Sequence, residues 1–173
     1  MRFVVILFIL VILQSAGCKQ TTEYKPTVSN QELEDDLIAF NRQKVERENA
    51  AIDNYLNSLN LTMEKSNTGL RYLIDRKGSG DTIVFGVEVE VKYDIYLIDS
   101  TLCYSSKITG NKRFFVEESD EMPGMHELVK LLRVGDSARS ILPSRLGYGF
   151  TGDSDKIPCD AVLLLDVEVL SAL

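Results

Sequence analysis

The sequence has no tryptophan, a single histidine and three cysteines among its 173 residues. The cysteines, Cys18, Cys103 and Cys159, lie far apart, and none belongs to a CxxC pair. Zinc sites and dithiol redox sites need several such ligands close together. We therefore expect a protein that uses no metal and no cofactor.

Basic residues are outnumbered by acidic ones. There are 19 Lys and Arg against 26 Asp and Glu, a formal net charge of −7. The phosphates of nucleic acids and the headgroups of anionic lipids repel an acidic protein. We therefore expect no nucleic-acid partner, and we expect any membrane contact to come from an attached lipid rather than from a basic surface.

Long hydrophobic runs are absent except at the start of the chain, where Phe3–Leu13 follows Arg2. This run of about eleven residues is too short for a hydrocarbon core of about 30 Å, which needs about twenty, and is typical of a signal peptide. Ser15-Ala16-Gly17-Cys18 resembles the bacterial lipobox, whose cysteine is lipidated and becomes the new N-terminus. The expectations are a signal peptide over residues 1–17, lipidation of Cys18, and a lipid anchor in the bacterial cell envelope that leaves the protein facing the periplasm.

The next two segments differ in pattern. Residues 18–28 are the lipidated cysteine and a polar tether. Ser29 and Glu32 then have the spacing of a capping box, and apolar residues recur at helical intervals to about Leu59. We expect an N-terminal amphipathic helix over residues 29–61 that serves as a spacer or docking surface without chemistry of its own. Pairing of this helix with a second copy would give a homodimer, an option that the sequence leaves open.

From Thr62 onward the apolar period changes to two. The clearest strand is residues 87–97, where Val89, Val91 and Tyr93 alternate with polar residues, and further strands are expected at 70–75, 113–117, 137–142 and 162–170. A short amphipathic helix is expected from Pro123 to about Arg133. These patterns predict an α+β domain over residues 62–173, in which the helix fills the concave face of a curved antiparallel sheet.

Some motifs have a plain structural interpretation. Gly78-Ser79-Gly80 precedes a strand rather than a helix, so we expect a turn and not a phosphate loop. His126 has no nucleophile or acid partner in sequence and is expected at the surface. The acidic residues of 117–121 are expected to form a solvated loop.

Several ordered motifs carry a family resemblance. They are Met122-Pro123-Gly124-Met125, then 134–139, then 141–149, then Ile157-Pro158, and finally 165–170. In this order and spacing they resemble the FKBP family, whose pattern runs roughly VIPGW, VGxKxxxxIPxxLAYG, IPP and FDVELL. The resemblance covers about residues 66–173. It implies a twisted antiparallel sheet of about five or six strands wrapped around one short helix, and peptidyl-prolyl cis–trans isomerase activity on proline-containing envelope polypeptides.

The resemblance also implies which residues form the site. Tyr148, Tyr93 and Met122 would be catalytic, with the Tyr148 hydroxyl and the Met122 backbone N–H holding substrate carbonyls. The substrate-binding residues carried over from the family pattern are Cys103, Tyr104, Phe114, Phe115, Met125, Ile157 and Leu165.

The predicted pocket is less aromatic than the family pattern. Met125 stands where the family has tryptophan, Cys103-Tyr104 replaces Phe-Asp, and Leu165 replaces phenylalanine. This departure sustains a second hypothesis beside the isomerase: a membrane-tethered chaperone or assembly module that has the FKBP fold and weak or no catalysis.

Overall fold

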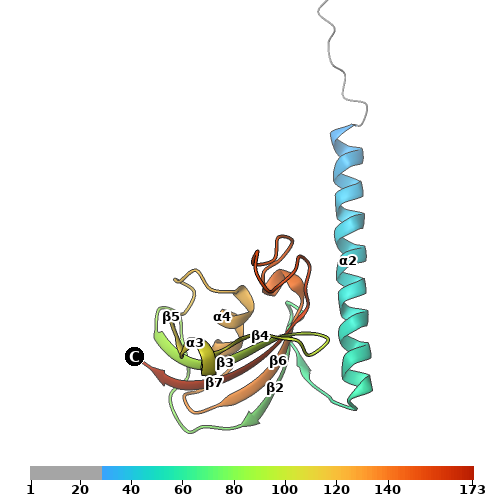
Figure 1. Ribbon diagram of the computed structural model, residues 1–173. Helices are drawn as coiled ribbons and strands as arrows, with labels where there is room; N and C mark the ends of the chain where they lie inside the picture. Colours follow the sequence, from blue (N-terminus) through green and yellow to red (C-terminus); the bar gives the residue numbers. More distant parts are fainter. Residues whose placement is uncertain (1–28) are drawn as a thin grey trace, which may run out of the picture. The chain divides into compact units, whose positions relative to one another are not determined.

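The computed structural model describes residues 29–173, so the predicted signal peptide, the predicted lipidation of Cys18 and the predicted tether lie outside the described residues. Figure 1 shows a curved sheet with a short helix, α4, on one side. In chain order the elements are α2 (Asn30–Ser58), β1 (Glu64–Lys65), β2 (Arg71–Arg76), β3 (Glu88–Leu97), β4 (Leu102–Ser105), α3 (Ser106–Thr109), β5 (Lys112–Phe115), α4 (Pro123–Lys130), β6 (Ser137–Leu142), η1 (Ser144–Leu146) and β7 (Leu163–Ala172).

Two compact units divide the chain, one ending at Ile38 and one running from Ala39 to Leu173. In the first unit, the described part is the beginning of α2. The backbone N–H of Glu32 donates to the Ser29 hydroxyl at 3.1 Å, so Ser29 caps the helix as its spacing predicts. No helix within residues 29–173 combines the length and the hydropathy that crossing a membrane requires.

The second unit contains the sheet. Its strands run in the order β1-β2-β6-β7-β3-β4, with β5 also paired to β3, and all the pairs are antiparallel. The predicted α+β class is confirmed. The described residues form seven strands rather than five or six, because the two-residue β1 adds an edge and because β4 and β5 both pair with β3.

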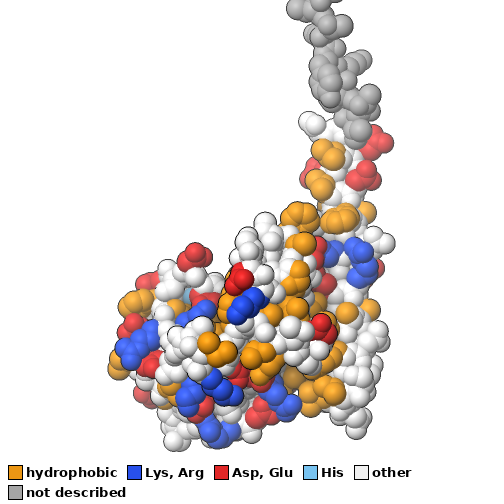
Figure 2. All heavy atoms as spheres, in the orientation of Figure 1, with side chains coloured by type: hydrophobic (Ala, Val, Ile, Leu, Met, Phe, Trp, Pro, Cys, Tyr) orange, Lys and Arg blue, Asp and Glu red, His pale blue; other side chains and the backbone are white. Residues whose placement is uncertain are grey.

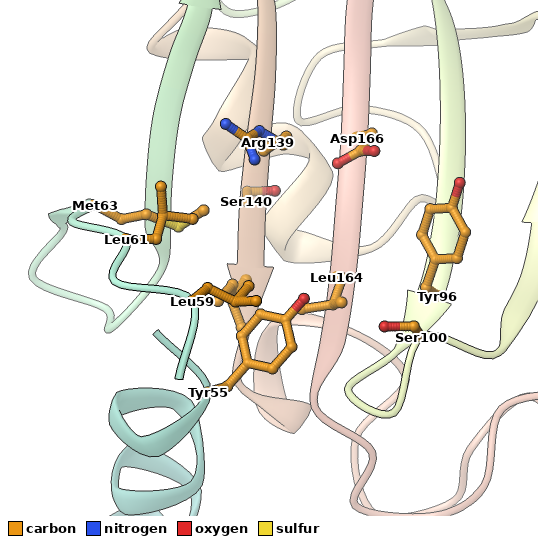
Figure 3. Close-up of a pocket in the computed structure, with 11 residues that line it drawn as sticks. Tyr55, Leu59, Leu61, Met63, Tyr96, Ser100, Arg139, Ser140, Leu164 and Asp166 are labelled. Carbon is orange, nitrogen blue, oxygen red and sulfur yellow. The ribbon is translucent and has the colours of Figure 1, made fainter. Parts of the chain in front are cut away.

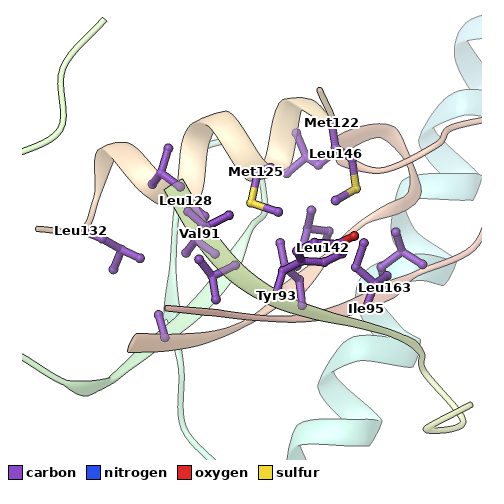
Figure 4. Close-up of a cluster of buried hydrophobic side chains, with 14 of the residues drawn as sticks. Val91, Tyr93, Ile95, Met122, Met125, Leu128, Leu132, Leu142, Leu146 and Leu163 are labelled. Atoms are coloured by element: carbon purple, nitrogen blue, oxygen red, sulfur yellow. The ribbon is translucent and has the colours of Figure 1, made fainter. Parts of the chain in front are cut away.

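One face of the sheet packs against α4. Val89, Val91 and Ile95 of β3 point to this face and are buried, which is the alternation that the sequence shows. Figure 4 shows Met125 and Leu128 over this strand. The helix ends at Lys130, three residues earlier than expected, because its last turn tightens: the N–H groups of Leu131 and Leu132 bond three residues back, to Leu128 and Val129.

The opposite face is covered in part by the second half of α2. Ile52 and Leu56 form a small buried cluster with Ile141 and Val162. Arg71, which the strand pattern places on the polar side, is buried here and donates to Asp53 at 3.1 Å. The polar face of this strand is therefore a helix-packing face.

Charge is spread evenly over the visible surface. Figure 2 shows basic and acidic side chains interspersed on the face that it draws. Cross-strand ion pairs account for part of this pattern, for example Arg113 with Glu90 at 2.6 Å and Arg76 with Glu168 at 2.7 Å. Exposed pairs of this kind contribute little to stability.

Candidate functional site

Nine of the ten predicted site residues lie together on the α4 side of the sheet. Tyr93, Cys103, Phe114, Met122, Met125, Ile157 and Leu165 are buried in one hydrophobic cluster, and Tyr104 and Tyr148 are partly buried against it. They come from β3, β4, β5, the start of α4, the loop after η1 and β7. Residues far apart in the sequence therefore meet in one apolar cluster.

Phe115 is the member that the structure does not bring to this cluster. Strand β5 alternates, so Phe114 points inward and Phe115 outward, with 46% of its surface exposed. Its backbone N–H donates to the Ser119 hydroxyl at 2.9 Å. Phe115 is corrected from a pocket residue to a surface residue.

Tyr148 stands at the edge of the buried cluster. The described residues provide no hydrogen-bond partner for its hydroxyl. Burial, followed by the negative charges of Glu121 and Asp153, raises the pKa of Tyr148 to about 12. The hydroxyl therefore keeps its proton at neutral pH and is able to donate to a carbonyl oxygen.

Beside Tyr148 a hollow of about 560 Å³ opens to solvent. It is lined by the predicted catalytic residues Met122 and Tyr148, by Pro123, Gly147, Thr151 and Gly152, and by three charged residues, Lys112, Asp120 and Glu121. A polypeptide segment entering this hollow would meet the phenol of Tyr148 and the start of α4 together.

The backbone N–H of Met122, the other predicted donor, is already engaged. It donates to a carboxylate oxygen of Glu121 at 2.9 Å. The second oxygen of that carboxylate pairs with Lys112 at 2.6 Å, and the Lys112 ammonium lies 5.0 Å from the centre of the Tyr93 ring. Glu121 therefore belongs to the site, which the interpretation of residues 117–121 as a solvated loop missed.

The hydroxyls of the other two tyrosines are committed to protein partners. Tyr93 bonds the Thr109 hydroxyl at 2.9 Å, so its ring rather than its hydroxyl faces the cluster. Tyr104 donates to Asp153, which also accepts from the backbone N–H groups of Asp155 and Ile157. Although burial opposes its charge, these bonds lower the pKa of Asp153. Asp153 thus fixes the loop that carries Ile157.

His126 is buried, which corrects the expectation of a surface position. Its Nδ1 accepts from the backbone N–H of Glu117 at 3.0 Å, and its ring meets Phe114 edge-on at 5.3 Å. The residue therefore anchors the acidic loop to α4. The sequence does not reveal this bond, because Glu117 and His126 are nine residues apart and only the fold brings them together.

The chemistry available at this site is binding and hydrogen bonding. Within residues 29–173 no group of three or more His, Cys, Asp or Glu is arranged to hold a metal ion. Cys103 is buried and Cys159 exposed, and they are not joined. Burial raises the pKa of the Cys103 thiol, which makes it a poor nucleophile.

Comparison with known proteins gives consistent matches. Residues 80–170 match the family described as FKBP-type peptidyl-prolyl cis-trans isomerase. A probable FKBP-type isomerase FkpA of Neisseria meningitidis is 35% identical over 133 residues, covering 75% of this chain and 46% of the relative. The FkpA isomerase of Aeromonas hydrophila is 31% identical over 147 residues, covering 85% and 48%. The chain thus spans about half the length of these relatives.

A solved structure has a similar fold. The crystal structure of FkpA from Escherichia coli gives a TM-score of 0.65 at 23% identity, covering 99% of this chain and 82% of that one. The resemblance that the ordered motifs suggested is confirmed by the family match across residues 80–170. The chain belongs to the FKBP-type peptidyl-prolyl cis-trans isomerase family.

Proposed function

We propose that the protein is a peptidyl-prolyl cis–trans isomerase that acts on proline-containing polypeptides of the cell envelope. The observation that carries this proposal is Tyr148, a protonated donor without a protein partner at the edge of a buried apolar cluster. Rotation of an X–Pro bond needs no nucleophile, metal or cofactor. It needs a surface that binds the twisted amide better than the planar one.

The physical basis is the loss of amide resonance. The barrier to rotation is about 18–20 kcal/mol, and uncatalysed X–Pro exchange takes tens of seconds or longer. The planar amide is more polar than the twisted one, so an apolar environment disfavours the planar ground state. A thousandfold rate gain corresponds to about 4 kcal/mol, which desolvation and one or two oriented donors can supply.

Each residue has a role in this proposal. Met125, Leu165 and Ile157 form the buried apolar floor, and the ring of Tyr93 flanks it. Tyr148 donates to a substrate carbonyl. The Met122 N–H donates to a second carbonyl once it is released from Glu121.

The test is an isomerisation assay on short X–Pro peptides, with the wild type and Tyr148→Phe compared after both have been shown to melt cooperatively. Loss of a hydrogen bond worth about 1 kcal/mol should slow catalysis about fivefold. If the wild type matches the uncatalysed rate but still binds proline peptides, the alternative holds: a tethered chaperone or assembly module with the FKBP fold.

We further propose that the protein is a lipoprotein of the bacterial envelope, anchored through Cys18 and facing the periplasm. The support is the sequence of residues 1–18, which has the features of a signal peptide and lipobox. Cys18→Ala should abolish membrane association in cell fractionation. A mature variant that stayed in the membrane would contradict the anchor.

A homodimer through the N-terminal helix is also part of the proposal. Leu33 and Leu37, four residues apart on one side of α2, are both more than half exposed. Analytical ultracentrifugation of Leu33→Glu/Leu37→Glu against the wild type tests this pairing, because charges on that side of the helix should leave only monomer.

A further inference from the structure

A second hollow lies on the face of the sheet opposite α4. Its volume is about 210 Å³. Its walls are mainly apolar and aromatic, and they come from the end of α2, the segment after it and the exposed sides of β6 and β7. The lining includes Tyr55, Leu59, Leu164, Tyr96, Arg139 and Asp166.

The hollow has an apolar end and a charged end. Figure 3 shows Arg139 and Asp166 together at one end, with Tyr55 and Leu59 toward the other. The ring of Tyr96 stands to one side. An occupant must therefore combine an aliphatic part with a polar tip.

The charge at the polar end is negative. Arg139 makes two hydrogen bonds to Asp75, at 2.7 and 2.9 Å, so its charge is balanced by that carboxylate. Asp166 has no hydrogen-bond or ion-pair partner for its carboxylate among the described residues. It stands opposite Asp94 in the β3–β7 ladder and opposite Arg139 in the β6–β7 ladder. Asp94 pairs with Lys107 at 3.6 Å, as Arg139 does with Asp75, so the uncompensated charge is that of Asp166.

Burial is the largest influence on Asp166 and raises its pKa. Arg139 opposes this effect, and Asp94 and Asp75 add to it. A bound cation would pair with the Asp166 carboxylate. The ring of Tyr96, which also lines the hollow, is a favourable neighbour for a cation. Because Leu59 and Leu164 line the rest of the hollow, the fitting cation is one that carries an aliphatic stem.

We propose that this hollow is a second binding site, which takes a lysine or arginine side chain of an extended polypeptide. The aliphatic stem packs between Leu59 and Leu164, and the charged tip reaches Asp166. The site lies on the other face of the sheet from Tyr148, so it binds a chain independently of proline.

The test is a calorimetric titration of the full chain with a proline-free peptide that has one central lysine, and with the same peptide carrying norleucine there. The lysine peptide should bind about tenfold more tightly, as expected for a hydrogen bond to a charged group. Asp166→Asn should abolish this difference. Glu168→Gln is the matched control, because it removes the same charge from the same strand at a residue paired with Arg76 and Lys92.

A third variant does not depend on the Asp166 substitution being tolerated. Leu59 is more than half exposed, so Leu59→Arg should fold and place its own cation in the hollow, blocking the peptide. Equal affinity for the two peptides, or equal loss in both acid variants, would overturn the proposal. The proposal would also be overturned if the wild type bound neither peptide and formed an oligomer that the Asp166→Asn variant did not form. The occupant of the hollow would then be a second copy.

A different observation concerns Glu121 in the candidate site. Its carboxylate is almost buried, and it holds both the Met122 N–H and the Lys112 ammonium. Its charge also contributes to the raised pKa of Tyr148. The family pattern has valine at this position, which offers no acceptor.

We infer that Glu121 is a specificity-determining residue of the proposed isomerase. In the free protein the Glu121 carboxylate accepts a hydrogen bond from the Met122 N–H, the donor that a substrate carbonyl needs. When a substrate carbonyl displaces it, the carboxylate remains beside the bound segment. Its negative charge there favours a basic residue next to proline over an acidic one. This inference rests on the proposed function.

The test measures binding and turnover separately for Lys-Pro and Glu-Pro peptides. Glu121→Val should lower KM for both peptides several-fold with kcat little changed, and the preference for Lys-Pro should disappear. Glu118→Val is the control, since it removes an exposed acid of the same loop that does not line the hollow beside Tyr148. A rise in KM, or an unchanged Lys-Pro preference, would overturn the inference. Direct titration with the same peptides keeps the test valid if the wild type shows no turnover.

Discussion

The two faces of the sheet are built in different ways. On the α4 side, alternate residues of β3 and β7 are buried and apolar, and the candidate site is part of the same cluster. On the other side, the intervening residues of β7 are half-buried and include Leu164, Asp166 and Glu168. A small apolar cluster with α2 lies there beside a row of charges.

The two faces are stabilised by different kinds of interaction. The α4 side gains its free energy from close packing of many apolar side chains. The other side is held by specific polar contacts between distant segments, such as Arg71 with Asp53, and Glu48 with Ser144. Substitutions on each face can test whether the two faces contribute unequally to stability and whether they act independently.

The largest effect is expected from cavities in the two clusters. Leu128→Ala opens a cavity in the large cluster and should cost about 3–5 kcal/mol, whereas Leu56→Ala should cost about 2–3 kcal/mol because its smaller cluster can relax. Urea denaturation with an unchanged m-value measures both. If Leu56→Ala were the more costly change, α2 rather than α4 would be the principal stabilising helix.

A smaller loss is expected from Met125→Trp, which introduces the aromatic floor of the family pattern. Met125 is fully buried, and even a Cβ on the neighbouring Gly124 would overlap Leu142. Overpacking should cost about 1–3 kcal/mol, against less than about 1.5 kcal/mol for the control Met125→Leu. Thermal melting compares the two. A tryptophan variant as stable as the wild type would mean that the pocket has spare volume.

Much of the α4 side could be predicted from the sequence because its signals are local. Alternation in residues 87–97 and the helical spacing of Met125, Leu128 and Val129 identify the elements and the faces that they bury. The family motifs then place Tyr93, Met122 and Tyr148 in one site, and the structure brings them together.

Contacts between distant residues could not be predicted in this way on either side of the sheet. Arg71 resembles an exposed strand residue until α2 covers it, and Glu121 resembles a member of a solvated loop until Lys112 and Met122 approach its carboxylate. Phe114 and Phe115 are equally apolar, so only the register of β5 on β3 decides which one is buried.

Helix α2 is connected to the loop that carries Tyr148 through Glu48, and a conservative change can test this connection. Glu48 of α2 accepts from the Ser144 backbone and hydroxyl at 3.2 and 2.6 Å, and the Ser144 carbonyl accepts from Gly147 and Gly149, on either side of Tyr148. Glu48→Gln should reduce isomerisation two- to threefold through the orientation of Tyr148, and stability by about 1 kcal/mol. Glu46→Gln, at an exposed position of the same helix, is the control. Equal activities would mean that α2 does not influence the site.

The smallest effect is a change in alkaline stability that reports the burial of Tyr148. Its pKa is raised from an ordinary value of 10 to about 12, mainly by burial, so the folded protein favours the protonated phenol. This contribution is complete below pH 10. It is lost as the pH rises from 10 through 12, because the unfolded chain releases the proton first. Tyr148→Phe has no such proton, so its stability should fall less steeply between pH 10 and 12 than that of the wild type, as measured by denaturant titrations at several pH values. Parallel losses in the two proteins would indicate that the phenol is solvated, and the site would then lack the dry, protonated donor on which the proposed catalysis depends.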